Sequence, residues 1–231
     1  MKLIFATVAF LIVSVSALRP FDRSQIDFKN EDSVVSYFQN AIQDLGESIR
    51  AAGWDPLYIE RKQINYTLPV PVIYNSTYVV EDVLSTGLSG IVVKMASYNV
   101  DSSSLSFDIQ LPFTMASFGN GIVETTFFGT TFKISSSGRV AIPRLRFVGQ
   151  IGIDVNNSGV TVNSSNITFT MGGIACDVHL KIQDDDYSDM MNEFIFKNLP
   201  EKIKQYNNEI NELFGILSKD YINDYLRAGK N

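Results

Sequence analysis

One stretch in the middle of the chain decides the fold: Leu105-Ser106-Phe107-Asp108-Ile109-Gln110-Leu111-Pro112-Phe113. Large apolar side chains occupy every second position of this stretch, and all the positions between them except Pro112 are polar. Because successive side chains of a β-strand point to opposite faces, the alternation predicts a strand with one apolar and one polar face. Residues 141–155 and 174–182 show a similar alternation, which is typical of an antiparallel sheet with one buried side.

The spacing of turn residues predicts that these strands are unusually long. Glycine, serine, asparagine and aspartate clusters indicate turns at 101–104, 119–121, 135–138, 156–159 and 172–173. The strands between them would have about 14 to 17 residues, against a usual length of about 5 to 6. A strand of about 14 residues extends about 46 Å. We therefore expect a strongly twisted sheet that curls around a partner of similar length.

Two segments change to helical periodicity, with apolar residues three and four positions apart. The first is 30–52, where Asn30 or Asp32 is the expected N-cap and Gly53 follows the end. The second is 188–226, which Pro200 is expected to kink or restart. Its part after Pro200 would span about 40 Å, close to the strand length. The sequence thus predicts one α+β domain, in which a long, strongly curved antiparallel sheet wraps around a long C-terminal helix after an N-terminal helix.

The first 17 residues have the pattern of a secretory signal peptide. Lys2 forms a short positive region, an apolar run follows, and Val15-Ser16-Ala17 suits cleavage after Ala17. The apolar run is shorter than the roughly 20 residues that span a bilayer, and no later segment supplies such a run. We expect a secreted, extracellular protein with no integral membrane span, whose mature domain is 18–231.

Five N-x-Ser/Thr sequons agree with the secretory route, and a glycan requires an outward-facing asparagine. In 64–75 the apolar alternation places Asn65 and Asn75 on the polar face. Around Asn163 and Asn166 the alternation changes phase, and a bulge or a break there would leave both side chains outside. The predicted glycosylation sites are Asn65, Asn75, Asn156, Asn163 and Asn166.

Charge and composition argue against several functions. The net charge of −6 is unfavourable for binding nucleic acid. His179, the single histidine, falls on a polar strand face beside Asp177 and Lys181, without a G-x-S-x-G nucleophile motif. Cys176, the single cysteine, cannot form an intramolecular disulfide and is predicted as a buried thiol, with an intermolecular disulfide as the alternative.

The acidic run Asp184-Asp185-Asp186 suggests calcium binding, but it lacks the glycine and final glutamate of an EF-hand loop. Acidic residues before a helix are better explained by the dipole of its N-terminus. No metal site, catalytic residue or cofactor is therefore expected.

The apolar residues of the strands and of the second helix have two interpretations: a solid core or the lining of a cavity. Periodicity alone does not distinguish them. If a ligand cavity exists, its predicted lining residues are Phe107, Ile109, Leu111, Phe113, Phe128, Phe132, Phe147, Phe169, Ile210, Leu213, Phe214 and Leu217.

Two short motifs resemble a known family. Ala51-Ala52-Gly53-Trp54-Asp55-Pro56-Leu57 follows the first helix, and Val83-Leu84-Ser85-Thr86-Gly87-Leu88-Ser89 comes later. Together they resemble the DP-hydrophobic and V-x-GL elements of arthropod group 7 mite allergen-like proteins, relatives of the juvenile-hormone-binding and takeout proteins. The resemblance implies a tubular lipid-binding fold with an apolar cavity. The hormone-binding and takeout branch typically carries an N-terminal disulfide, which a chain with one cysteine lacks, so the group 7-like branch is favoured.

We therefore expect a secreted carrier of a small hydrophobic ligand, such as a fatty acid or terpenoid, rather than an enzyme. The alternative is a secreted interaction protein with a filled core that binds a protein receptor or a microbial lipid. A hydrolase that uses two carboxylates is the weakest candidate, because no motif singles out a pair of them.

Overall fold

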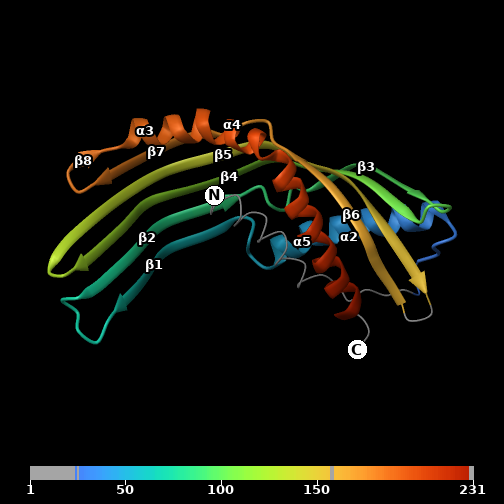
Figure 1. The fold of residues 1–231 in the computed structure, drawn as a ribbon, viewed down its shortest axis with the longest axis horizontal. Coiled ribbons are helices and arrows are strands. Elements are labelled where there is room, and N and C mark those ends of the chain that lie inside the picture. Colours follow the sequence, from blue (N-terminus) through green and yellow to red (C-terminus); the bar gives the residue numbers. More distant parts are fainter. Residues whose placement is uncertain (1–23, 25, 157–158, 229–231) are drawn as a thin grey trace.

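The computed structural model describes residues 24, 26–156 and 159–228. Within these ranges helix α2 (Glu31–Ala51) precedes one antiparallel sheet, and further helical segments follow it (Figure 1). The strands are β1 (Leu57–Thr67), β2 (Tyr74–Thr86), β3 (Val92–Asn99), β4 (Ser104–Phe127), β5 (Thr130–Asn156), β6 (Gly159–Thr170), β7 (Ala175–Ile182) and β8 (Asp185–Asp186). The helical segments after the sheet are α3 (Ser188–Glu193), the π-helix η3 (Phe194–Asn198), α4 (Leu199–Gln205) and α5 (Asn207–Ala228).

Helix α2 begins and ends where the sequence predicted. The Asn30 side chain caps the helix, because its Oδ1 accepts hydrogen bonds from the N–H groups of Asp32 at 3.0 Å and Ser33 at 3.3 Å. Gly53 follows the last turn with a φ of 71°, a conformation that glycine adopts without strain. The predicted helix 30–52 is confirmed to within one residue at each end.

Strands β4 and β5 form the long hairpin at the centre of the sheet, with 24 and 27 residues. Their turn is at Phe128 and Gly129, which both have positive φ. The sequence did not predict this turn, since a large apolar residue such as Phe128 is uncommon in the left-handed region. The strands also exceed the predicted lengths.

The predicted turns at 119–121 and 135–138 were wrong, because both segments lie inside β4 and β5. The β4–β5 register shifts between Phe118 and Gly121, so this is a bulge. A Cβ at Gly119 would come within 3.0 Å of the Asp82 side chain, and one at Gly138 would collide with the carbonyl oxygen of Asp177. These glycines therefore permit close contact between neighbouring strands rather than a reversal of the chain.

The sheet is a curled antiparallel sheet with an N-terminal and a C-terminal helix, as predicted (Figure 1). Its strand order is β1-β2-β4-β5-β7-β8, while β3 pairs with β4 and β6 pairs with β5. The free side of β5 therefore carries two strands, β7 along its first part and β6 along its last part. Helices α2 and α5 lie toward the end that contains β3 and β6, and α3 lies beside β7 (Figure 1).

The C-terminal helical region has one interruption that the sequence did not predict. Pro200 lies directly after the π-helical turn η3, at the start of α4. The helix does not restart there, because Asn198 and Leu199 both have right-handed helical φ and ψ and η3 continues directly into α4. The interruption follows at Tyr206, with φ of −102° and ψ of 26°, and α5 starts after it.

Asparagine side chains attach α5 to the edge strand β6. The Asn223 amide accepts the N–H of Val162 at 2.7 Å and donates to the carbonyl oxygen of the same residue at 3.0 Å. Asn211, three helical turns earlier, accepts the N–H of Phe169 at 2.9 Å. These amides replace the backbone of a neighbouring strand, so the helix covers an edge that would otherwise be exposed.

The phase change around Asn163 and Asn166, where either a bulge or a break was expected, is a bulge. Gly152 pairs with Ser164 and Ile153 pairs with Val162, which leaves Asn163 as the extra residue of β6. Asn163 and Asn166 are exposed, as are Asn65 and Asn156, and Asn75 is half-buried. Asn65 lies opposite Thr77 and Asn75 lies opposite Thr67, so the first two sequons share one face of the β1–β2 hairpin.

Candidate ligand cavity

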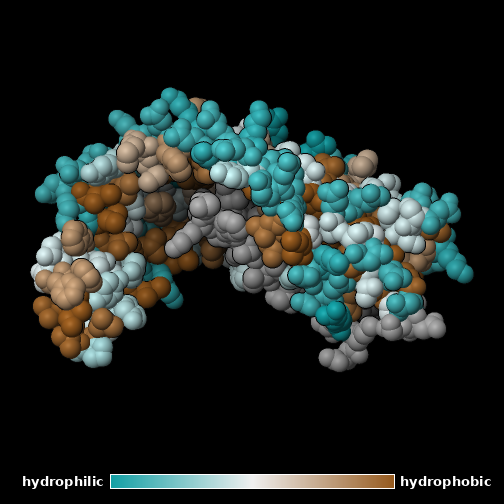
Figure 2. Space-filling model, viewed as in Figure 1, coloured by the Kyte–Doolittle hydropathy of each residue, from teal (hydrophilic) through white to brown (hydrophobic). Residues whose placement is uncertain are grey.

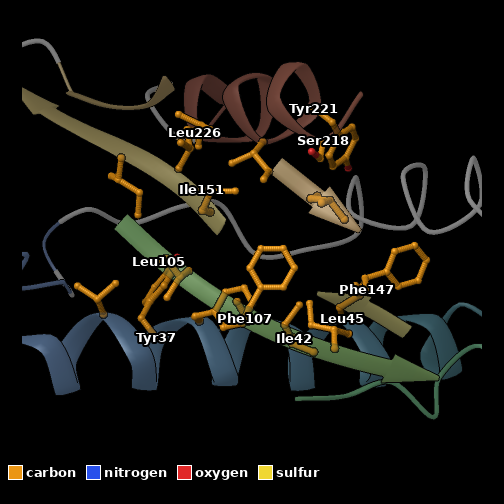
Figure 3. Close-up of a pocket in the computed structure, with 18 of the residues that line it drawn as sticks. Tyr37, Ile42, Leu45, Leu105, Phe107, Phe147, Ile151, Ser218, Tyr221 and Leu226 are labelled. Atoms are coloured by element: carbon orange, nitrogen blue, oxygen red, sulfur yellow. The ribbon is translucent and has the colours of Figure 1, made fainter. Parts of the chain in front are cut away.

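A cavity of about 360 Å³ lies between the two long helices and the sheet (Figure 3). Helix α2 forms one wall, α5 forms the opposite wall, and β4, β5 and β6 lie between them. None of the lining residues that the structure describes is charged. They are Ile26, Phe28, Val34, Tyr37, Phe38, Ala41, Ile42, Leu45, Ile91, Leu105, Phe107, Ile109, Phe147, Ile151, Ile153, Val160, Val162, Ile167, Phe214, Leu217, Ser218, Tyr221, Ile222 and Leu226.

Within each strand or helix, the lining residues recur with the period of that element and so share one face. The residues from β4 are Leu105, Phe107 and Ile109, which share one strand face because they are two positions apart. Those from α2 and α5 are three and four positions apart, so each helix turns one apolar stripe toward the strands. Figure 3 shows Tyr37, Ile42 and Leu45 of α2 on one side and Ser218, Tyr221 and Leu226 of α5 on the other.

Within the described part of the chain, three lining residues carry a polar side-chain atom: Tyr37, Ser218 and Tyr221. The Ser218 hydroxyl forms a hydrogen bond with the Ser165 hydroxyl at 2.8 Å and donates to the carbonyl oxygen of Gly215 at 3.1 Å. The protein itself therefore uses the hydrogen-bonding capacity of Ser218. The cavity can remove apolar surface from water, and none of its lining residues supplies a charge to pair with an ionic group.

The structure divides the twelve predicted lining residues into four groups. Five line the cavity: Phe107, Ile109, Phe147, Phe214 and Leu217. Leu111, Phe169 and Ile210 belong to a packed cluster beside it, in which the Phe169 ring lies 5.3 Å from both Phe147 and Phe214. Leu213 is half-buried on α5, outside the lining. The remaining three lie outside the cavity and are 50% to 68% exposed: Phe113, Phe128 and Phe132.

Phe113 lies outside because the strand alternation breaks at Pro112. Leu111 is fully buried, yet the next buried residue is Thr114, three positions later instead of two. Arg144 on the neighbouring strand has a positive φ of 54°, at the same level of the β4–β5 hairpin. On one side of this point the buried residues are Leu111 and Leu145, and on the other side they are Thr114 and Ile142. The inward-facing positions of both strands thus shift from odd to even residue numbers, which the sequence alone did not reveal.

Several lining residues were missed although the sequence contained a signal for them. The apolar stripe of α2 predicts a helix with one apolar face, but neighbouring residues in the sequence do not indicate what that face contacts. The same holds for Tyr221, Ile222 and Leu226 at the end of α5. The residues of β6 were also missed, namely Val160, Val162 and Ile167.

The two motifs that carry the family resemblance meet in space beside the cavity. The Asp55 carboxylate accepts hydrogen bonds from the N–H of Gly87 at 2.9 Å and from the N–H and hydroxyl of Ser89, both at 2.6 Å. Arg50 at the end of α2 donates to the Ser89 hydroxyl at 3.0 Å. Burial alone would raise the pKa of Asp55, but the hydrogen bonds from Ser89 and Gly87 and the charge of Arg50 outweigh it and lower that pKa. These contacts join α2 to the turn after β2, so their role is structural.

The chemically distinctive residues of β7 lie apart from the cavity. His179 is exposed, and its Nε2 is 3.9 Å from the Asp177 carboxylate. Cys176 is half-buried with its Sγ 3.5 Å from the carbonyl oxygen of Asn192, and burial, followed by the charge of Asp177, raises the pKa of its thiol. Asn192 also pairs its amide with the backbone of Val178, at 2.9 and 2.8 Å.

The acidic run after β7 is exposed. Asp186 accepts a hydrogen bond from the N–H of Ser188 at 2.8 Å, at the start of α3, which fits the helix-start interpretation. Among the described residues, no group of three or more histidine, cysteine or acidic side chains is placed to hold a metal ion. Within the same residues, no helix combines the length and apolar character that a bilayer span requires.

Comparisons with known proteins place the chain in a family. The model of the family "Haemolymph juvenile hormone binding protein (JHBP)" matches residues 5–228. Among solved structures, Takeout 1 of Epiphyas postvittana is similar with a TM-score of 0.48 and 11% identity, over 90% of this chain and 95% of that one. A lipopolysaccharide binding protein is similar with a TM-score of 0.31 and 10% identity, over 83% of this chain and 37% of that one. No curated protein matches the sequence. The family match extends over nearly the whole chain, and the protein therefore belongs to the haemolymph juvenile hormone binding protein family.

Proposed function

We propose that the protein binds and carries a small hydrophobic ligand, such as a fatty acid or a terpenoid, in the cavity between α2 and α5. The observation that supports this most directly is a cavity of about 360 Å³ with an uncharged, almost entirely hydrocarbon lining. This volume is within the usual range of ligand sites. Each CH₂ group removed from water contributes about 0.8 kcal/mol, so a chain of about twelve carbons gains about 10 kcal/mol before the cost of association.

The lining favours ligands that carry no charge inside the cavity. An ionised carboxylate enclosed there would lose its hydration without gaining a cationic partner, which is strongly unfavourable. A neutral terpenoid ester or alcohol fits this environment throughout its length. A fatty acid fits it when the alkyl chain is enclosed and the carboxylate stays at the opening. Function by burial requires no catalytic group, so we propose a binding protein rather than an enzyme.

Native mass spectrometry and lipid extraction of the purified protein test the proposal, together with displacement of a fluorescent fatty acid probe. Ala41→Trp fills part of the cavity from α2 and is expected to weaken probe binding by at least about tenfold. Asn40→Trp adds the same side chain to the exposed face of the same helix turn and should leave binding unchanged. Thermal unfolding checks that both variants fold. Equal binding by the two variants, or a wild-type protein without lipid or probe affinity, would contradict the proposal.

We also propose that the protein is secreted and glycosylated and belongs to the group 7-like branch of its family. The supporting features are the signal-peptide pattern of residues 1–17, which lie outside the described residues, the sequons and the single cysteine. The mature chain would be the single domain 18–231. N-terminal sequencing and mass measurement before and after enzymatic deglycosylation test the first two points. Retention of residues 1–17 or an unchanged mass would contradict them.

A further inference from the structure

Two hairpin turns lie side by side at the end of the sheet opposite α2 and α5 (Figure 1). The β4–β5 turn contacts the β1–β2 loop through its backbone, because the N–H of Phe128 donates to Ile73 at 3.2 Å and the N–H of Gly129 donates to Val72 at 3.0 Å. The apolar side chains of these turns form one surface, here called the apolar tip. It consists of Val70, Val72, Ile73, Phe127 and Phe128.

The apolar tip is exposed and uncharged. Its members are between 39% and 68% exposed, and Phe128 is the most exposed of them. The segments that carry it, 66–74 and 125–132, contain no charged residue. Figure 2 shows hydrophobic atoms gathered at this protruding end of the molecule. Exposed apolar side chains concentrated on a protrusion indicate contact with another apolar phase.

Several backbone donors of the β1–β2 loop are missing or already hydrogen-bonded. Pro69 and Pro71 have no N–H group, the N–H of Leu68 donates to Tyr74 at 3.1 Å, and that of Ile73 donates to Val70 at 3.0 Å. Satisfied or missing donors reduce the cost of placing a turn in lipid. Directly behind the tip, the rings of Tyr66 and Tyr74 lie 5.8 Å apart, and tyrosine favours the boundary between lipid and water.

The charges nearest the tip define the kind of lipid surface. The β7–β8 turn lies beside the start of β5, because the N–H of Gln183 donates to the carbonyl oxygen of Lys133 at 2.8 Å. That turn leads into Asp184-Asp185-Asp186, while Glu124 and Lys133 lie opposite each other on the β4–β5 hairpin and offset each other's charge. The charges near the tip thus provide no net attraction for anionic lipids, which leaves neutral or zwitterionic headgroups.

We propose that the apolar tip docks the protein onto zwitterionic lipid surfaces by shallow insertion of Phe128 and its neighbours. This function is separate from ligand binding in the cavity, which lies at the other end of the sheet. The tip would hold the protein at the surface reversibly, because its buried apolar area is small. Binding should not increase with anionic lipid or decrease with salt.

Flotation of the full mature protein with phosphatidylcholine vesicles tests the docking function. Phe128→Asp is expected to lower the partition coefficient by at least about tenfold, since it removes the most exposed ring of the tip and adds a charge. Phe196→Asp in η3 is the matched control, because Phe196 is 62% exposed but lies away from the tip. The control should bind vesicles like the wild type. Absence of wild-type binding, or equal loss in both variants, would overturn the proposal.

A second measurement locates the contact directly. Tryptophan fluorescence of Phe128→Trp should be quenched by brominated phosphatidylcholine, whereas that of Phe196→Trp should not. Displacement of the cavity probe should be unchanged in Phe128→Asp, and vesicle binding should be unchanged in Ala41→Trp. Quenching at position 196 alone, or at both positions equally, would show that another surface meets the lipid.

Discussion

Alternating apolar residues occur in both halves of the sheet, but the environments of the two halves are very different. In the half beneath α2 and α5, alternate residues such as Leu105 and Phe107 are 3% and 6% exposed. In the other half, Ile64, Tyr66 and Phe132 are 50% to 57% exposed, although they also belong to alternating strands. Figure 2 shows hydrophobic atoms along the hollow of this second half. The difference teaches that alternation determines which face is apolar, while the position of the helices determines which part of that face is buried.

The strand register shows which residues of the second half lie next to one another on neighbouring strands. Tyr66 pairs with Ser76, Ser76 with Thr125, and Thr125 with Phe132, so these four residues form one row across the sheet. Thr125 and Phe132 belong to the hairpin of β4 and β5, and the other end of this hairpin lies under α2 and α5. Tyr66 and Phe132 at the two ends of this row are 56% and 50% exposed, whereas Ser76 between them is fully buried. The two large rings are exposed because neither α2 nor α5 covers this part of the sheet (Figure 1).

The largest expected effect compares one phenylalanine from each half. Phe169→Ala removes a ring that is 3% exposed and contacts two other rings, so it should lower the free energy of unfolding by about 3 to 5 kcal/mol. Phe132→Ala removes a half-exposed ring and should cost less than about 1 kcal/mol. Urea unfolding measures both values. Equal costs would show that the second half is buried in solution.

The next effect concerns the attachment of α5 to the buried half. Asn223→Ala leaves the N–H and carbonyl of Val162 without their partner and should lower the free energy of unfolding by about 2 kcal/mol. Asn208→Ala, an exposed asparagine near the start of the same helix, should change it by less than about 0.5 kcal/mol. Hydrogen exchange at Val162 provides a local readout. Unchanged protection there would contradict the proposed role of Asn223.

The smallest effect concerns the pH dependence of the contact between α2 and the turn after β2. The pKa of Asp55 is lowered in the folded state, so its stabilising contribution is complete above the ordinary aspartate pKa and is lost as pH falls through the folded value. Asp55→Asn should cost about 1 kcal/mol at neutral pH, and the difference from wild type should shrink below about pH 4. Chemical unfolding across this range measures it. A constant difference at all pH values would exclude the carboxylate charge as the cause.

The sequence predicted the fold well wherever the signal is local. Neighbouring residues predicted an N-cap at Asn30 or Asp32, the end of α2 before Gly53 and an irregularity near Asn163. The structure confirms the helix end and selects Asn30 as the cap and a bulge at Asn163. The glycines at 119 and 138 misled the interpretation, because a glycine needed for close strand contact resembles a glycine needed for a turn. Only the pairing partners, Asp82 and Asp177, distinguish the two uses.

The candidate site was predictable in part for the same reason. Phe107, Ile109 and Phe147 were found because strand alternation points them to one face, and Phe214 and Leu217 because of the stripe on α5. Leu111 and Phe169 have the same pattern and pack solidly instead. Whether an apolar side chain meets a neighbour or an empty volume depends on the shapes of elements that are distant in the chain.

By itself, the sequence determined the types of the main elements, the order of helix, sheet and helix, and the apolar face of each. Those properties follow from backbone geometry, which repeats every 2 residues in a strand and every 3.6 in a helix. The tertiary structure alone decided where the sheet is covered, that α5 attaches to the edge of β6, and that a cavity of about 360 Å³ remains between α2 and α5. The physical reason is that burial and cavity volume arise from contacts between distant segments, which no local period encodes.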